Sequence, residues 1–181
     1  TTAGAILISQ YLGAKEDRQA NSMANHVCLC SLLFSLVCAA VCWCITPGIV
    51  GWLGAEGNIF LYGISYLRIV VLDLPFLFMI NIYTAVKQSQ GDTVRPMLLN
   101  VLGVSVNLIL DPLFLMKFSW GISGAALATL LAKIPSAVLA LYVLTRKGQL
   151  IQINFKGFRF EKTKMLSILK IGLPTAIGGS T

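Results

Sequence analysis

Charged side chains are scarce in this sequence: Asp, Glu, Lys and Arg make up 12% of its 181 residues, while apolar residues make up 56%. A soluble domain usually carries about 25% charged residues, so the chain has roughly half the polar surface that it would need in water. This shortage excludes a soluble enzyme, a disordered tail and a secreted mini-protein. The class that remains is an integral membrane protein.

Motifs of catalysis and of metal binding are missing as well. The sequence has no Walker loop, no GxSxG, no HExxH and no spaced carboxylates around a pocket, so we expect no catalytic residues. A membrane-embedded enzyme with its catalytic groups elsewhere is the alternative. All five cysteines fall in one apolar run, without a CxxC pair and with the single histidine, His26, at its end. We interpret them as small apolar side chains and expect no metal site.

Long apolar runs are what the sequence has in place of charge. A helix needs about 20 mostly apolar residues to cross a bilayer, and four runs meet that length, at 24–45, 62–86, 97–116 and 121–145. They lack the period-two alternation of barrel strands, so they predict an all-α bundle of transmembrane helices. We expect Thr46-Pro47-Gly48 to close the first run. The apolar runs at 1–13 and 166–181 resemble spans cut part-way, so we expect an internal segment of a longer protein.

Basic residues are distributed unevenly between the loops. The loops at 14–23, 87–96 and 146–165 hold ten of them, whereas the loops at 46–61 and 117–120 hold only Lys117. By the positive-inside rule, the first three loops are predicted to be cytoplasmic, in a multi-pass protein of the plasma membrane. The orientation and the lipid headgroups thus explain most of the net charge of +7, and we expect no nucleic-acid partner.

Charged residues inside the predicted spans are the strongest functional signal. A charge at the bilayer centre costs about 2.5–3.5 kcal/mol on insertion scales, so such residues usually face a partner or a water-filled cavity. Arg68, Asp73, Asp111 and Lys133 are in this position, whereas Lys170 lies close enough to the membrane surface to snorkel. Arg68 and Asp73 are five positions apart and on different sides of a helix, so they are poor partners for each other. Asp73 faces either a cavity or a neighbouring helix.

Asp111 is the strongest candidate for a functional site. Asn107 precedes it by one helical turn, on the same face, and Pro112 leaves the carbonyl of Leu108 without its helical donor. These oxygens suit a hard cation such as Na⁺, or a carboxyl group that takes up a proton. The alternative is an aspartate that only bonds to a neighbouring helix.

The run at 121–145 adds Thr129 and Lys133, which are one helical turn apart. Thr129 lies on a face of small residues that lets helices approach closely, and its hydroxyl either joins a cation site or bonds to its own helix. Lys133 either supplies a tethered cation to Asp111 or Asp73 in one state, or forms a fixed pair that holds helices together. Each of three charged residues has a proline close behind it, where we expect the helix to bend: Pro75, Pro112 and Pro135.

Four sequence blocks occur in a characteristic order. Residues 4–15 read GAILISQYLGAK, 90–97 read QGDTVRPM, 107–114 read NLILDPLF and 120–129 read WGISGAALAT. In sequence and spacing, these blocks resemble the multidrug and toxic compound extrusion (MATE) family. They are similar to its second helix with the first cytoplasmic loop, its loop between helices 4 and 5, and its helices 5 and 6.

The resemblance implies a protein of twelve helices in two six-helix lobes around a V-shaped cavity. Residues 1–145 then hold the end of helix 2 and helices 3–6, residues 146–165 form the cytoplasmic loop between the lobes, and residues 166–181 begin helix 7. The implied partners are a small amphipathic substrate, the lipid bilayer and the remainder of the protein's own chain.

Family members export amphipathic organic cations and other xenobiotics in exchange for Na⁺ or H⁺, without a cofactor. The resemblance implies the same activity here, by alternating access. Where the first lobe couples the ion, the family uses an Asp of helix 1 with three residues that match Asn107, Asp111 and Thr129; Lys133 is not part of that pattern. The alternative is a related flippase of lipid-linked saccharide precursors, for which Arg68 and Lys133 would supply a cationic cavity.

Overall fold

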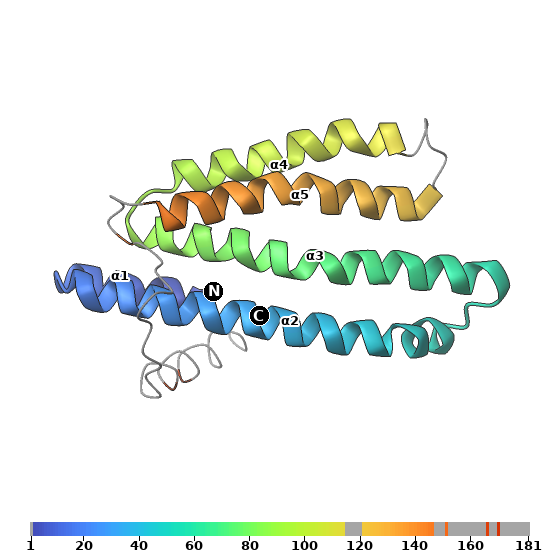
Figure 1. Ribbon diagram of the computed structural model, residues 1–181, viewed down its shortest axis with the longest axis horizontal. Coiled ribbons are helices and arrows are strands. Elements are labelled where there is room, and N and C mark those ends of the chain that lie inside the picture. The colour runs from blue at the N-terminus through green and yellow to red at the C-terminus, as the bar shows by residue number, and fades with distance from the viewer. Residues whose placement is uncertain (1, 115–120, 147–150, 152–165, 167–169, 171–181) are drawn as a thin grey trace.

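Five helices and no strand make up the part of the chain that the computed structural model describes, which is residues 2–114, 121–146, 151, 166 and 170 (Figure 1). The helices are α1 (Thr2–Gly13), α2 (Asp17–Trp52), α3 (Gly57–Ser89), α4 (Val94–Pro112) and α5 (Gly121–Thr145). The three helices α2, α3 and α4 and the stretch Ser123–Thr145 of α5 are long and apolar enough to cross a membrane. The predicted all-α bundle with four full spans is confirmed.

Helix ends differ from the predicted spans because hydropathy reports only the apolar part of a helix. α3 extends beyond the predicted 62–86 at both ends, and α2 begins at Asp17, before the predicted start. α4 begins at Val94 and ends at Pro112; the predicted end at Met116 lies outside the described residues. α5 has the predicted bounds. Polar turns at the helix ends therefore continue the spans past their apolar cores.

The predicted helix end at Thr46-Pro47-Gly48 is wrong, because α2 continues through these residues to Trp52. Pro47 removes one backbone hydrogen bond from the helix. The neighbouring Thr46 hydroxyl donates to the carbonyl oxygen of Cys42 at 2.7 Å, within the same turn. In lipid no water can replace helical hydrogen bonds, so leaving the helix would cost more than keeping it with one bond missing.

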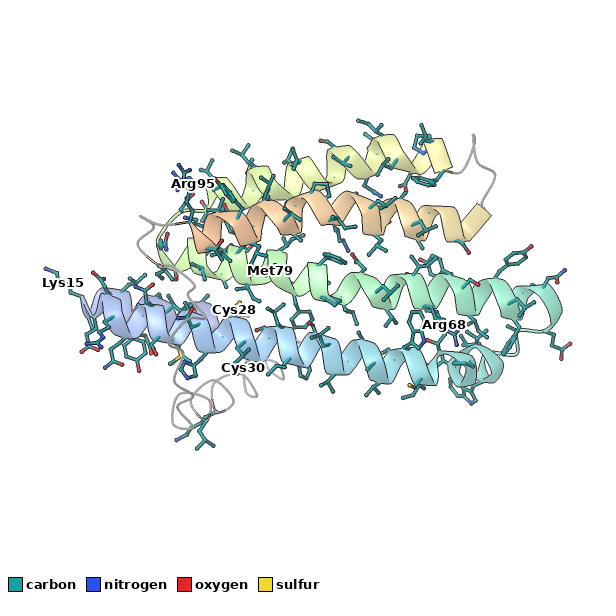
Figure 2. All side chains as sticks on the ribbon, viewed as in Figure 1. Lys15, Cys28, Cys30, Arg68, Met79 and Arg95 are labelled. Atoms are coloured by element: carbon teal, nitrogen blue, oxygen red, sulfur yellow. The ribbon has the colours of Figure 1, made fainter. Side chains whose placement is uncertain are left out.

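The four long helices lie side by side and alternate in direction (Figure 1). α3 lies between α2 and α5, α4 packs mainly on α5, and the short α1 packs on α2 and α3. α1, α3 and α5 end at one side of the bundle, whereas α2 and α4 end at the other. Lys15 and Arg95, from two of the loops predicted to be cytoplasmic, lie at the same end (Figure 2). The arrangement is the one that the predicted grouping of basic loops requires.

A buried apolar cluster lies where α1 meets α2 and α3. It includes Ile8 of α1, Met23 and Val27 of α2 and Ile82 of α3, each at most 2% exposed. Gly4 permits the close approach of α1 to α2, since a Cβ atom there would lie 2.6 Å from Cγ1 of Val27. This end of the bundle is closely packed, and the charged residues of the spans lie farther along α3, α4 and α5.

Candidate functional site

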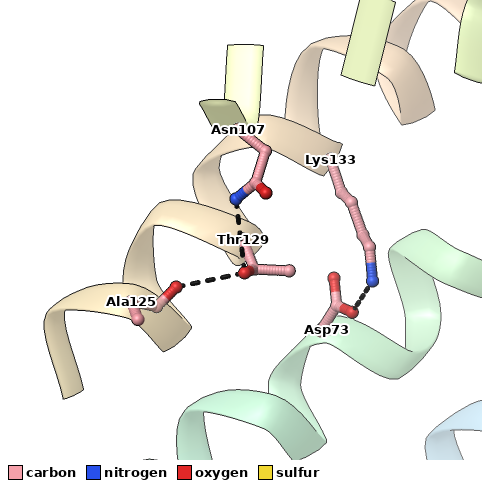
Figure 3. Close-up of polar contacts among 5 residues, drawn as sticks. All are labelled: Asp73, Asn107, Ala125, Thr129 and Lys133. Carbon is pink, nitrogen blue, oxygen red and sulfur yellow. Dashed lines mark hydrogen bonds and ion pairs between the residues drawn. The ribbon is translucent and has the colours of Figure 1, made fainter. Parts of the chain in front are cut away.

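Asp73 and Lys133 form an ion pair halfway along the bundle. Asp73 is the central residue of the 33-residue helix α3, and Lys133 is the central residue of the 25-residue helix α5. Nζ of Lys133 donates to Oδ2 of Asp73 and so joins the two helices (Figure 3). The side chain of Asp73 is 12% exposed and that of Lys133 is 28% exposed. Of the two pairings predicted for Lys133, the structure contains the one with Asp73.

A second polar group joins α4 to α5 through Asn107. Nδ2 of Asn107 donates to Oδ1 of Asp111 at 3.2 Å and to Oγ1 of Thr129 at 3.4 Å. The Thr129 hydroxyl in turn donates to the carbonyl oxygen of Ala125 at 3.1 Å (Figure 3). The structure thus brings together the three residues predicted to bind a coupling ion. The Thr129 hydroxyl bonds to its own helix, which was one of the two alternatives, and it also accepts from Asn107; its part in a cation site stays a prediction.

The ion pair and the Asn107 group share one cavity of about 260 Å³. Asp73 reaches it from α3, Asp111 from α4, and Thr129 and Lys133 from α5. Charges that line one small cavity influence one another, because the Coulomb interaction grows as their separation falls. Two carboxylates and one ammonium group leave the ionised wall with one excess negative charge.

A second cavity of about 310 Å³ is lined by the same Thr129 and Lys133 and adds further amides, Asn81 and Asn100. Asn81 and Asn100 were not predicted as site residues, because neither is charged and neither lies one helical turn from a charged residue of its span. A carboxamide inside an apolar run also indicates a functional site, though less strongly than a charge does. Its hydrogen-bond donors and acceptors need partners in lipid too.

Arg68 lies apart from these cavities. Its guanidinium carbon is 5.1 Å from the centre of the Trp43 ring, a cation–π contact that links α3 to α2. Arg68 lines neither the 260 Å³ nor the 310 Å³ cavity, and its Nε is buried with no hydrogen-bond partner among the described residues. The structure therefore does not bring Arg68 together with Asp73, Asp111 or Lys133.

The three prolines lie next to the polar groups. Pro75 and Pro135 follow Asp73 and Lys133 by two positions, and the helices continue through them, whereas Pro112 is the last residue of α4. Each proline leaves one carbonyl of the preceding turn without a backbone donor, which adds a polar group close to the site. The bends predicted at these positions stay predictions.

The five cysteines are free thiols along α2, from the buried Cys28 to the exposed Cys44. In the described ranges, no three His, Cys, Asp or Glu side chains gather in a group that could hold a metal ion. Reduced cysteine behaves as a small apolar side chain, which suits a helix in a membrane.

Sequence comparison identifies the family. A family profile described as MatE matches residues 1–113 of this chain. The chain belongs to the MatE family. The resemblance found in the sequence blocks is confirmed, and the four apolar helices of this MatE chain make it a multi-pass membrane protein of a transporter family.

Known MatE proteins match the chain over nearly its whole length. Multidrug export protein MepA of Staphylococcus haemolyticus (strain JCSC1435) is 28% identical over 171 residues, which are 94% of this chain and 38% of MepA. An inward-facing structure of a multidrug resistance MATE family transporter has a TM-score of 0.87 at 26% identity, over 96% of this chain and 40% of that one. An outward-facing structure has a TM-score of 0.89 at 25% identity, over 97% and 39%. The chain spans about two fifths of the length of these proteins.

Proposed function

We propose that the protein containing this MatE segment exports amphipathic cationic drugs in exchange for Na⁺ or H⁺. The observation that carries the proposal is the placement of Asp111, whose carboxylate is bonded to Asn107 and lines a cavity between three membrane-spanning helices. The similarity to a multidrug export protein and to multidrug resistance transporters supports a drug as the cargo. The excess negative charge of the cavity supports a cationic one.

The lobe arrangement and the orientation are part of the same proposal. Residues 1–145 form part of one lobe, with the end of helix 2 and helices 3–6. We expect residues 146–165 to link this lobe to the second and residues 166–181 to begin the second lobe; apart from residues 146, 151, 166 and 170, these two ranges lie outside the described residues. The loops rich in Lys and Arg face the cytoplasm, and the membrane is the plasma membrane. The parts that complete the cavity then lie in the remainder of the protein's own chain.

Asp111 is the residue that takes the coupling ion. While ionised, it attracts the amide N–H of Asn107, which also reaches Thr129 on the neighbouring helix. A proton or Na⁺ on Asp111 weakens that attraction, because a hydrogen bond to a neutralised carboxyl group is weaker than one to a free anion. The Asn107 amide then turns, and since it joins α4 to α5, loading the ion changes the contact between these helices.

Alternating access is the proposed route for the drug. The segment resembles both inward-facing and outward-facing structures, which supports a movement of this lobe largely as one body against the rest of the protein. Bending near Pro112 and Pro135 would transmit the change at Asp111. Exchange requires that the ion and the drug prefer different states, since a ligand with equal affinity for both states shifts neither.

Replacing Asp111 tests the proposal. In proteoliposomes with the full-length protein, we expect Asp111→Asn to reduce drug export driven by a pH or Na⁺ gradient about tenfold or more. An amide neither takes up a proton nor balances the charge of Na⁺. Asp92→Asn is the matched control, because Asp92 lies between α3 and α4, where it pairs with Arg95 in the first turn of α4. Export by Asp111→Asn with the pH and Na⁺ dependence of the wild type would refute the assignment.

A flippase for lipid-linked saccharide precursors is the second candidate, because Lys133 places an ammonium group on the cavity wall. Binding a pyrophosphate requires excess positive charge. Asp73 already pairs with Lys133, and Asp111 adds a further negative charge. The balance of these charges favours the export of cations over the flipping of anions.

A further inference from the structure

We infer that the cavity of about 260 Å³ contains a binding site for the ammonium group of a protonated primary or secondary amine. The acceptor is Oδ1 of Asp73, the carboxylate oxygen that Lys133 does not use. The inference rests on the proposed function, because it takes this amine to be the exported compound. It gives Asp73 the role of binding the cargo, distinct from the ion-binding role of Asp111.

Oδ1 of Asp73 is a buried acceptor without a donor. Asp73 is 8% exposed as a whole residue and 12% exposed in its side chain. Lys133 bonds to its Oδ2, and its buried Oδ1 has no hydrogen-bond partner in the described part of the chain. An ionised carboxylate can accept about four hydrogen bonds, and a buried polar atom that makes none is destabilising. A ligand that brings an N–H donor would remove this cost on binding.

The charges around the cavity favour a ligand with one positive charge. The charged side chains that line it are Asp73 from α3, Asp111 from α4 and Lys133 from α5, and Tyr66 is the other titratable group. Lys133 balances Asp73 and leaves Asp111 uncompensated, so the excess negative charge belongs to the cavity as a whole. A single ammonium group would balance the remaining charge, whereas an anion would add to it.

The rest of the wall fits the carbon skeleton of an amine. Tyr66, Val70, Ala125 and Ala126 add an aromatic ring and small apolar side chains, and an aromatic face attracts cations. Figure 3 shows the side chains of Asp73 and Lys133 meeting between α3 and α5. Lys133 also lines the 310 Å³ cavity, so the two cavities are neighbours on this side chain.

Asp73 and Asp111 differ in the hydrogen bonds that their Oδ1 atoms accept. Asp111 already accepts a hydrogen bond from Asn107, whereas Oδ1 of Asp73 accepts none from the described residues. Asp73 is also at mid-length of its span, and secondary transporters commonly bind substrate near the bilayer midplane. Because both carboxylates line one small cavity, an amine at Asp73 repels a cation at Asp111. Loading one therefore weakens the other, which is a physical basis for exchange.

Two matched probes test the requirement for an N–H donor. Phenethylammonium and its N,N,N-trimethyl counterpart carry the same ring and charge, but only the first has N–H groups. In calorimetric titrations of the purified full-length protein, we expect phenethylammonium to bind about tenfold more tightly. The double variant Asp73→Asn/Lys133→Gln removes both charges of the pair together, and we expect it to bind both probes equally weakly.

A cavity-filling variant covers the case in which the double variant does not fold. Val70 lines the cavity and is 40% exposed, so Val70→Phe fills space while both charges remain. Val37→Phe, at an exposed position of α2 that lines neither cavity, is the matched control. We expect weaker binding of phenethylammonium with Val70→Phe and unchanged binding with Val37→Phe. Equal affinity of the wild type for both probes would overturn the inference and indicate that another part of the protein donates to Oδ1. An unchanged preference in the double variant, or unchanged binding with Val70→Phe, would also overturn it, because the probe would then bind away from Asp73.

Drug export by the same preparations separates the two proposals. Gradient-driven export without a preference for phenethylammonium would overturn the Asp73 site and leave the transporter assignment intact. A preference for phenethylammonium without gradient-driven export would overturn the transporter assignment and leave the Asp73 site intact.

Discussion

The packed end of the bundle and its polar middle hold helices together in different ways. At the packed end, apolar side chains of α1, α2 and α3 meet, and Ile8, Met23 and Ile82 are fully buried. In the middle, an ion pair and hydrogen bonds join α3, α4 and α5 beside open space. Both kinds of contact can join helices in lipid, but only the polar ones change when an ion binds. The packed end should therefore respond to side-chain size, and the middle to charge.

Removing one charge from the middle is expected to have the largest effect. Lys133→Met leaves Asp73 without its partner. Breaking a fully buried ion pair in this way costs about 3–5 kcal/mol of stability, and we expect a cost near the lower end of that range because the Lys133 side chain is 28% exposed. The double variant Asp73→Asn/Lys133→Met removes both charges and should recover most of the loss. Thermal unfolding of the full-length protein in detergent measures the stability of both variants. Equal stability of the single and the double variant would show that this pair does not join α3 to α5.

A change of size at the packed end is expected to have an intermediate effect. Gly4→Ala places a Cβ atom 2.6 Å from Cγ1 of Val27, and overpacking of this kind costs about 1–3 kcal/mol. Gly13→Ala is the matched control in the same helix, because a Cβ atom there meets nothing within 4 Å. We expect Gly4→Ala to unfold at a lower temperature than Gly13→Ala. The same unfolding temperature for both would mean that the end is less closely packed than its burial indicates.

Loss of a single hydrogen bond in the middle is expected to have the smallest effect on stability. Thr129→Val removes the contact with Asn107, and hydrogen bonds between helices in membranes average about 0.6 kcal/mol. A double-mutant cycle of Thr129→Val with Asn107→Ala, followed by thermal unfolding, isolates the contribution of this contact. A coupling energy of about 2 kcal/mol or more would make the contact a structural link, and the middle would then be less free to switch than proposed.

Contacts within one helix were predictable, and contacts between helices only in part. Asn107 and Asp111 could be placed together because one helical turn separates them on the same face. The meeting of Asn107 with Thr129 followed from the family resemblance, since no spacing rule joins residues of two helices. The end of α2 was mispredicted because the effect of Pro47 depends on the solvent: water can replace the missing backbone bond, whereas lipid cannot.

By itself, the sequence determined the order of the helices and the alternation of their loops, because hydrophobic length and loop charge are properties of consecutive residues. Tertiary structure decided that Lys133 pairs with Asp73, that Arg68 stacks on Trp43 and that Asn81 lines a cavity. Each of these outcomes depends on the rotation and the depth of one helix against another. Packing between helices sets that rotation and depth, and the spacing of residues within a single helix does not encode them.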